Sequence, residues 1–196
     1  MLKKILFVVV AVLAVLAIVV ATRPDRYEVS RSVTLAAPAV VAYEQVADFH
    51  RWSGWSPWAK LDPGMKEEYG GAVAGTGATY HWLGNDKVGE GRMTITDAQP
   101  GARVAVKLEF LKPFESLADT TFSFAPEGGG TKVTWSMAGK LGFVEKAMCL
   151  VKSMDAMIGP DFEKGLAALK SVAEAEARKA TQAQVVPAAA AAVPAK

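Results

Sequence analysis

The spacing of apolar side chains changes along the chain from one typical of strands to one typical of helices. Tyr27–Leu35 alternates, with Val29, Val33 and Leu35 on one face and mostly polar side chains on the other, which predicts a half-buried strand. Residues 65–139 read almost wholly as strands, separated by turns rich in glycine and proline. We therefore expect an antiparallel meander in the middle of the chain.

Helical patterns flank this meander. The segment after Pro38 suits a short amphipathic helix that ends near Asp48. A long helix is predicted from Phe143 to Ala177, because its apolar side chains keep a three- to four-residue spacing. Gly159-Pro160 lies in the middle of this helix, where the missing proline N–H predicts a kink.

The last residues of the chain follow neither pattern. Beyond Arg178 the sequence is rich in alanine, valine and proline and has no periodic apolar face. We expect residues 178–196 to form a disordered tail or a spacer.

The N-terminus carries an unbroken apolar stretch from Ile5 to Ala21, after Lys3 and Lys4. At about 1.5 Å per residue it reaches about 25 Å, the short end of a membrane span. A signal peptide is the alternative, although apolar regions of signal peptides usually run to about 7–15 residues. We favour a membrane anchor over residues 1–23, and the two lysines favour a folded domain outside the cytoplasm, on the periplasmic side of a bacterium.

Composition narrows the classes of partner and site. The 196 residues suit one globular domain with appendages, and a net charge of +2 without a basic run argues against nucleic acid. Cys149 is the single cysteine, so the chain has no internal disulfide, and we expect it to be buried and inert on the last helix. With only His50 and His81 as histidines, we expect no metal and no cofactor.

The segment Asp48–Pro63 holds three tryptophans, Trp52, Trp55 and Trp58, in a short stretch broken by glycine and proline. Tryptophan combines a large apolar body with one N–H donor, so such a cluster closes a core or lines a pocket. Both roles stay open from the sequence, and in either role the cluster marks the most informative part of the chain.

This segment and the order of elements resemble the SRPBCC, START–Bet v1-like superfamily, and within it the polyketide cyclase/dehydrase-like family. The further matching segments are spread over the globular part of the chain: Arg31–Leu35, Trp82–Gly91, Phe110–Phe114, Gly128–Trp135 and Asp161–Leu166. The resemblance implies an α+β helix-grip fold over residues 24–177, in which a curved antiparallel sheet wraps a long C-terminal helix and leaves a cavity between them.

The resemblance and the strand and helix periods together suggest which side chains face this cavity. The candidates are the tryptophan cluster and a set of large apolar side chains on the strands and the last helix: Trp52, Trp55, Trp58, Tyr80, Trp82, Phe110, Phe122, Trp135, Met154 and Met157. Such an apolar enclosure suits a hydrophobic small molecule or a lipid. The same side chains would equally fill an ordinary core.

No spacing of polar residues indicates an active site. The polar candidates for chemistry are scattered through the chain: Glu90, Arg92, Lys107, Glu109, Asp119, Asp155, His50 and His81. We favour non-catalytic binding of a hydrophobic ligand by a membrane-anchored domain. A cyclase or dehydratase would need Glu90, His81 or Asp119 to point into the cavity. A third alternative is a closed-core module that binds a protein partner through an exposed apolar patch.

Overall fold

A seven-stranded antiparallel sheet is the centre of the molecule. The computed structural model describes residues 1–190 and the side chains of residues 1–183. The strands are β1 (Arg26–Leu35), β2 (Lys66–Gly71), β3 (Ala78–Leu83), β4 (Glu90–Gln99), β5 (Arg103–Lys112), β6 (Ser116–Glu127) and β7 (Gly130–Lys140). Their order in the sheet is β1-β7-β6-β5-β4-β3-β2. The expected meander is thus confirmed, and β1 closes it by pairing with β7.

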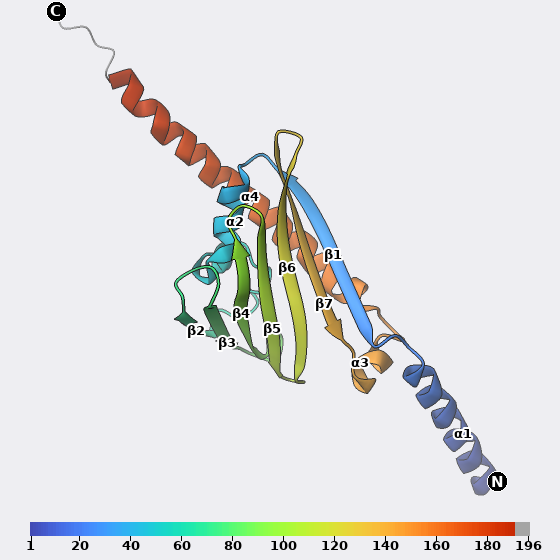
Figure 1. Cartoon of the computed structure of the whole chain (residues 1–196). Coiled ribbons are helices and arrows are strands. Elements are labelled where there is room, and N and C mark those ends of the chain that lie inside the picture. The colour runs from blue at the N-terminus through green and yellow to red at the C-terminus, as the bar shows by residue number, and fades with distance from the viewer. Residues whose placement is uncertain (191–196) are drawn as a thin grey trace, which may run out of the picture.

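The helices are α1 (Leu2–Ala21), α2 (Ala39–Ala47), the 3-10 helix η1 (Phe49–Gly54), α3 (Phe143–Met148) and α4 (Met154–Ala190). Of these, α2, η1 and α4 contact the strands and cover one face of the sheet (Figure 1). Helix α4 contacts β1, β7, α2 and η1, and its apolar residues Phe162, Leu166 and Leu169 are fully buried. This arrangement of a curved sheet around a long C-terminal helix is the helix-grip fold that the sequence predicts.

The predicted helix from Phe143 to Ala177 is divided in two, which corrects the sequence-based expectation. Ser153 ends the connection between α3 and α4, and its Oγ accepts a hydrogen bond from the N–H of Ala156 at 3.2 Å, as an N-cap does. Apolar spacing continues across this break and so could not reveal it. Pro160 lies inside α4, and a kink there stays a prediction.

Two further expectations for this region differ from the structure. Cys149 follows α3 as its C-terminal cap and is half-buried, whereas we expected a buried position on the last helix. Helix α4 runs through Ala190, past Arg178, where we expected a disordered tail or a spacer. Alanine has the highest helix propensity, so an alanine-rich segment readily extends an existing helix. The remainder of that expected tail, residues 191–196, lies outside the described residues.

The two long helices leave the domain at opposite ends (Figure 1). Helix α1 is joined to β1 by only four residues, and it projects from the end where β1 begins and β7 ends. Its side chains are almost all exposed, Val20 being the buried exception. An apolar helix with no partner over most of its length is the kind of element that a membrane would cover.

Candidate functional site

A cavity of about 330 Å³ lies between the sheet, α4 and the tryptophan segment. Its wall includes residues at the end of the sheet that lies nearest α1. These are Tyr27 at the start of β1, Leu141 after β7, and Leu117 at the start of β6. Val88, in the turn between β3 and β4, lines the cavity at the same end of the sheet but nearer its β2 edge. The cavity is therefore at the end of the domain from which α1 projects.

Eight of the ten predicted wall residues do line this cavity. They come from the tryptophan segment, three strands and the start of α4: Trp52, Trp58, Tyr80, Trp82, Phe110, Trp135, Met154 and Met157. The structure adds three side chains that are apolar and flexible, Met65, Met93 and Met137. A thioether side chain changes its rotamer at low cost, so these methionines suit a wall that adapts to its contents.

The other two predicted wall residues, Trp55 and Phe122, lie behind the wall. Trp55 is 2% exposed and its indole N–H donates to the carbonyl of Gln45 at 3.0 Å, while Phe122 is completely buried. Both rings contact Trp135, with centroid distances of 5.7 and 4.8 Å. They support the wall and do not reach the cavity. Strand alternation cannot show this difference, because Phe122 shares a face of the sheet with its register partner Trp135 and Trp55 belongs to no strand.

Trp135, on β7, joins the sheet to α4 through its ring. Its ring stacks on that of Phe162 with a centroid distance of 4.0 Å and an interplanar angle of 10°. The ring of Trp58 contacts that of Trp135 edge-on, with a centroid distance of 5.8 Å and an interplanar angle of 86°. Aromatic stacks of this kind add about 0.5–1.5 kcal/mol beyond the burial of their area. The inner end of the cavity is thus a rigid aromatic cluster.

Trp82 is positioned by a glycine on the neighbouring strand. A Cβ on Gly91 would overlap the six-membered ring of Trp82, so only glycine lets the indole lie flat across β4. The indole N–H donates to the carbonyl of Val88 at 3.0 Å. The ring of Tyr80 lies alongside, 5.9 Å away and within 20° of parallel. These contacts fix a flat aromatic surface as one side of the cavity.

Glu67 is one of three carboxylates of the cavity wall, with Glu145 and Asp161, and we did not predict it from the sequence. It accepts hydrogen bonds from the hydroxyls of Tyr80 at 2.9 Å and Tyr69 at 3.0 Å. Burial, and next the hydrogen bond to Glu67, raise the pKa of Tyr69 to about 12 and raise the pKa of Tyr80 further. The sequence did carry a signal for this group. Glu67 and Tyr69 are two residues apart and so share one face of β2, and their register partners on β3 are Trp82 and Tyr80.

The three residues that a cyclase or dehydratase was expected to use do not line the cavity. His81 lies between Glu90 and Glu68 on the outer face, with nitrogen–oxygen distances of 3.3 and 3.6 Å. Lys112 pairs with Glu90 at 2.6 Å and is the main cause that lowers the Glu90 pKa. Asp119 is exposed between the buried Ala118 and Thr120.

The other polar candidates form structural ion pairs or lie on the surface. Lys107 pairs with Glu109 along β5, at 3.0 Å, and Arg92 is exposed. His50 Nδ1 lies 2.8 Å from Asp48, and its ring stacks on Tyr69 with centroids 4.2 Å apart. Within the described residues, no group of three histidine, cysteine, aspartate or glutamate side chains is placed to hold a metal ion.

Two buried polar atoms of the wall residues, Thr120 Oγ1 and Trp135 Nε1, have no hydrogen-bond partner in the described part of the chain. Both atoms are closed off from the space that a water molecule would occupy. A ligand would therefore reach them only if the wall shifted. The wall of the cavity is mostly apolar, and its polar residues include Glu67, Glu145 and Asp161.

Comparisons with known proteins agree with the fold. The solved structures that share the fold include a protein from Chromobacterium violaceum, at 18% identity and a TM-score of 0.51, with 77% of this chain and 99% of that chain covered. A protein from Rhizobium leguminosarum is similar at 16% identity and a TM-score of 0.55, over 76% and 95% of the two chains. At such identities the likeness shows the fold alone.

Two further neighbours are described by a biosynthetic role. The di-domain ARO/CYC protein StfQ, from the steffimycin biosynthetic pathway, has 12% identity and a TM-score of 0.57, with 78% of this chain and 52% of StfQ covered. BexL, the di-domain ARO/CYC protein from the BE-7585A biosynthetic pathway, has 17% identity and a TM-score of 0.55, over 80% and 52%. This chain thus spans about half the length of each.

No curated protein matches the chain. A family model described as "Polyketide cyclase / dehydrase and lipid transport" matches residues 26–174, which include every strand and most of the part of α4 that packs on the sheet. The family that the sequence motifs suggested is confirmed. The chain belongs to the polyketide cyclase/dehydrase and lipid transport family.

Proposed function

We propose that the protein binds a hydrophobic small molecule or a lipid in the cavity between the sheet and α4, while α1 anchors it in a membrane. The observation that carries the proposal is the cavity itself. Its volume of about 330 Å³ falls within the range of about 300–1,000 Å³ typical of ligand pockets. A filled interior would be expected of a closed-core interaction module, so the cavity favours a binder.

The chemistry of the wall defines the class of ligand. Aromatic, methionine and aliphatic side chains together form most of the wall, so binding would be driven by apolar area removed from water, at about 25 cal/mol per Å². The flat surface of Trp82 and Tyr80 suits a planar or extended apolar group. Glu67, at the rim, would accept a hydrogen bond from a hydroxyl or amine group of the ligand.

Membrane anchorage rests on α1. Its most apolar stretch of 18 residues has a mean hydropathy of 3.1. Its 20 residues reach about 30 Å as a helix, the thickness of the hydrocarbon core. A signal sequence near an N-terminus has the same properties and is the alternative. With Lys3 and Lys4 retained in the cytoplasm, the domain would lie on the extracytoplasmic side.

The experiment is uptake of an apolar, environment-sensitive fluorophore by the full chain in mild detergent. Met157→Trp places a large ring in the cavity, whereas Met157→Leu conserves the volume and serves as the matched control. We expect saturable uptake by the wild type and the leucine variant and its loss in the tryptophan variant. Uptake by all three that equals that of an unrelated folded protein in the same detergent would contradict the proposal.

Catalysis in the same cavity is the second candidate, because Glu67 lines the wall and is bonded to two tyrosines. In a cyclase or dehydratase this carboxylate would be the general base or acid. Glu67→Gln separates the two functions: ligand uptake that persists while turnover of an apolar substrate is lost would favour an enzyme. Uptake without turnover in the wild type would favour a carrier.

A further inference from the structure

Exposed apolar side chains gather at the end of the domain that holds the cavity. Val151, in the connection between α3 and α4, is 92% exposed, and Phe143 of α3 is 58% exposed. Phe114, between β5 and β6, and Leu117, at the start of β6, are also largely exposed. We define this docking surface by six residues: Phe114, Leu117, Phe143, Val144, Met148 and Val151. Apolar side chains in such a cluster mark a surface that is covered by a partner.

The position of α1 identifies that partner. Helix α3 contacts α1, and Val20, in the last turn of α1, is 2% exposed. If α1 crosses the hydrocarbon core, its last turn lies at the membrane surface, and α3 lies at the same level. Figure 1 shows α1 projecting beside α3, at the same end of the sheet.

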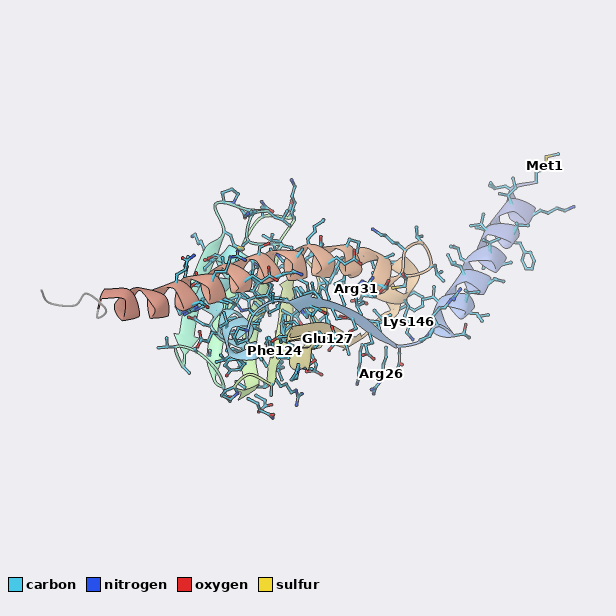
Figure 2. The ribbon with its side chains drawn as sticks, turned by 90° about the horizontal axis from the view of Figure 1, so that it is seen from above. Met1, Arg26, Arg31, Phe124, Glu127 and Lys146 are labelled. Atoms are coloured by element: carbon cyan, nitrogen blue, oxygen red, sulfur yellow. The ribbon has the colours of Figure 1, made fainter. Side chains whose placement is uncertain are left out.

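The charges at this end favour an anionic lipid surface. Arg26 and Lys140 are direct register partners on β1 and β7, although like charges in this arrangement repel each other. Lys146 on α3 and Lys152 after it add two more cations. In the part of the chain that the structure describes, none of the four forms a salt bridge. Figure 2 shows Arg26 and Lys146 at the end from which α1 leaves the domain. Anionic headgroups attract basic groups placed in this way.

The docking surface adjoins the cavity. Leu117 belongs to both, and Leu141 and Glu145, which flank Phe143, line the cavity. Met154, three residues after Val151, lines it from the first turn of α4. A bilayer in contact with the docking surface would therefore face the rim of the cavity.

We propose that the docking surface dips into the lipid headgroup layer of the bilayer that α1 spans, and that it seats the cavity rim on the membrane. The inference rests on the proposed anchorage by α1. Amphipathic elements bind at this depth through apolar side chains and flanking lysine or arginine residues. An apolar ligand would then pass between bilayer and cavity without crossing water.

The test measures depth in the membrane and uses no ligand. Single cysteines replace Val151, Val73 or Val12 in the full chain with Cys149→Ala, and each carries a bimane fluorophore. The protein is reconstituted into vesicles of phosphatidylcholine and phosphatidylglycerol that contain a nitroxide-labelled lipid. Val73 is the matched control, because it is 79% exposed in the loop at the opposite end of the sheet, between β2 and β3.

We expect quenching at Val12 within α1 and at Val151, and none at Val73. Quenching at Val12 with no more at Val151 than at Val73 would overturn the docking surface and leave the anchor standing. Absence of quenching at all three positions would overturn both. In Lys146→Gln/Lys152→Gln protein, quenching at Val151 should fall and lose its dependence on phosphatidylglycerol, and an unchanged signal would contradict the role of the cations.

Discussion

Arg31 on β1 holds Asp155 at the start of α4 through two hydrogen bonds, of 2.7 and 3.0 Å. Its Nε donates to Glu163 two turns further along the helix, at 2.8 Å, so one guanidinium bridges both carboxylates. Gly159 lies between them, and a Cβ there would overlap the guanidinium. This clamp fixes the first turns of α4, which carry Met154 and Met157 into the cavity wall.

The clamp predicts a pH dependence of stability. The hydrogen bonds from Arg31 hold the Asp155 pKa below its ordinary value of 3.8, so the unfolded state binds the proton first as the pH falls. The stabilisation is complete above that value and is lost as the pH falls below 3.8, through the folded-state pKa. Asp155→Asn should therefore lower the melting temperature at neutral pH, with a difference from wild type that shrinks in this acid window.

The matched control for the clamp is Asp161→Asn, which removes a carboxylate of the same helix whose ion pair is with Lys164 on α4 itself. It should change the melting temperature less than Asp155→Asn does. Equal melting temperatures for Asp155→Asn and the wild type at neutral pH would show that the clamp does not stabilise the fold.

Stacking of Phe162 on Trp135 predicts a large loss of stability in Phe162→Ala. Phe162 is fully buried, and truncation of such a ring typically costs about 3–5 kcal/mol. Phe143→Ala is the control, because this phenylalanine is 58% exposed and surface substitutions usually stay within about 0.5 kcal/mol. Denaturant unfolding of the full chain in detergent measures both. Similar free energies of unfolding for the two variants would contradict the described core.

Titration of Tyr69 tests its hydrogen bond to Glu67 in the cavity wall. Burial and Glu67 raise its pKa to about 12, so Glu67→Gln should lower this value part of the way toward the ordinary value of 10. Resonances of ¹³C-labelled tyrosine rings, followed against pH, report it directly. Glu68→Gln is the control, since Glu68 faces His81 on the other side of the strand and should leave Tyr69 unchanged.

The same shift sets the behaviour of the wild type at high pH. Because Tyr69 is harder to ionise in the folded state, the unfolded state loses the proton first above pH 10. Stability is thus fully present below pH 10 and falls as the pH rises from 10 to about 12. A melting temperature of wild type that falls no more steeply over this range than that of Glu67→Gln would count against the hydrogen bond.

Much of the fold could be predicted because its elements have one buried face. Val29 and Leu35 alternate with polar residues and define β1, and the long apolar stripe of Phe162, Leu166 and Leu169 defines α4. The residues at which helices begin and end could not be predicted in the same way. The break before Met154 depends on one capping hydroxyl, that of Ser153, and periodicity does not register a cap.

The apolar nature of the site could be predicted from the sequence, but the position of each side chain in it could not. Aromatic and methionine side chains on the inner face were identifiable, but the depth of each one was not. Trp55 and Phe122 pack behind Trp135, and this order depends on how η1 lies over the sheet. Glu67 was missed because its role depends on Tyr80, which lies on the neighbouring strand and not nearby in the sequence.

Native mass spectrometry of the full chain, purified in mild detergent from the organism that makes it, tests ligand binding most directly. We predict that the wild type carries one additional apolar mass, that Met157→Leu retains it, and that Met157→Trp loses it while remaining folded. A folded wild type that shows only the mass of the bare chain, even after incubation with lipid extract from the same cells, would contradict the proposed function.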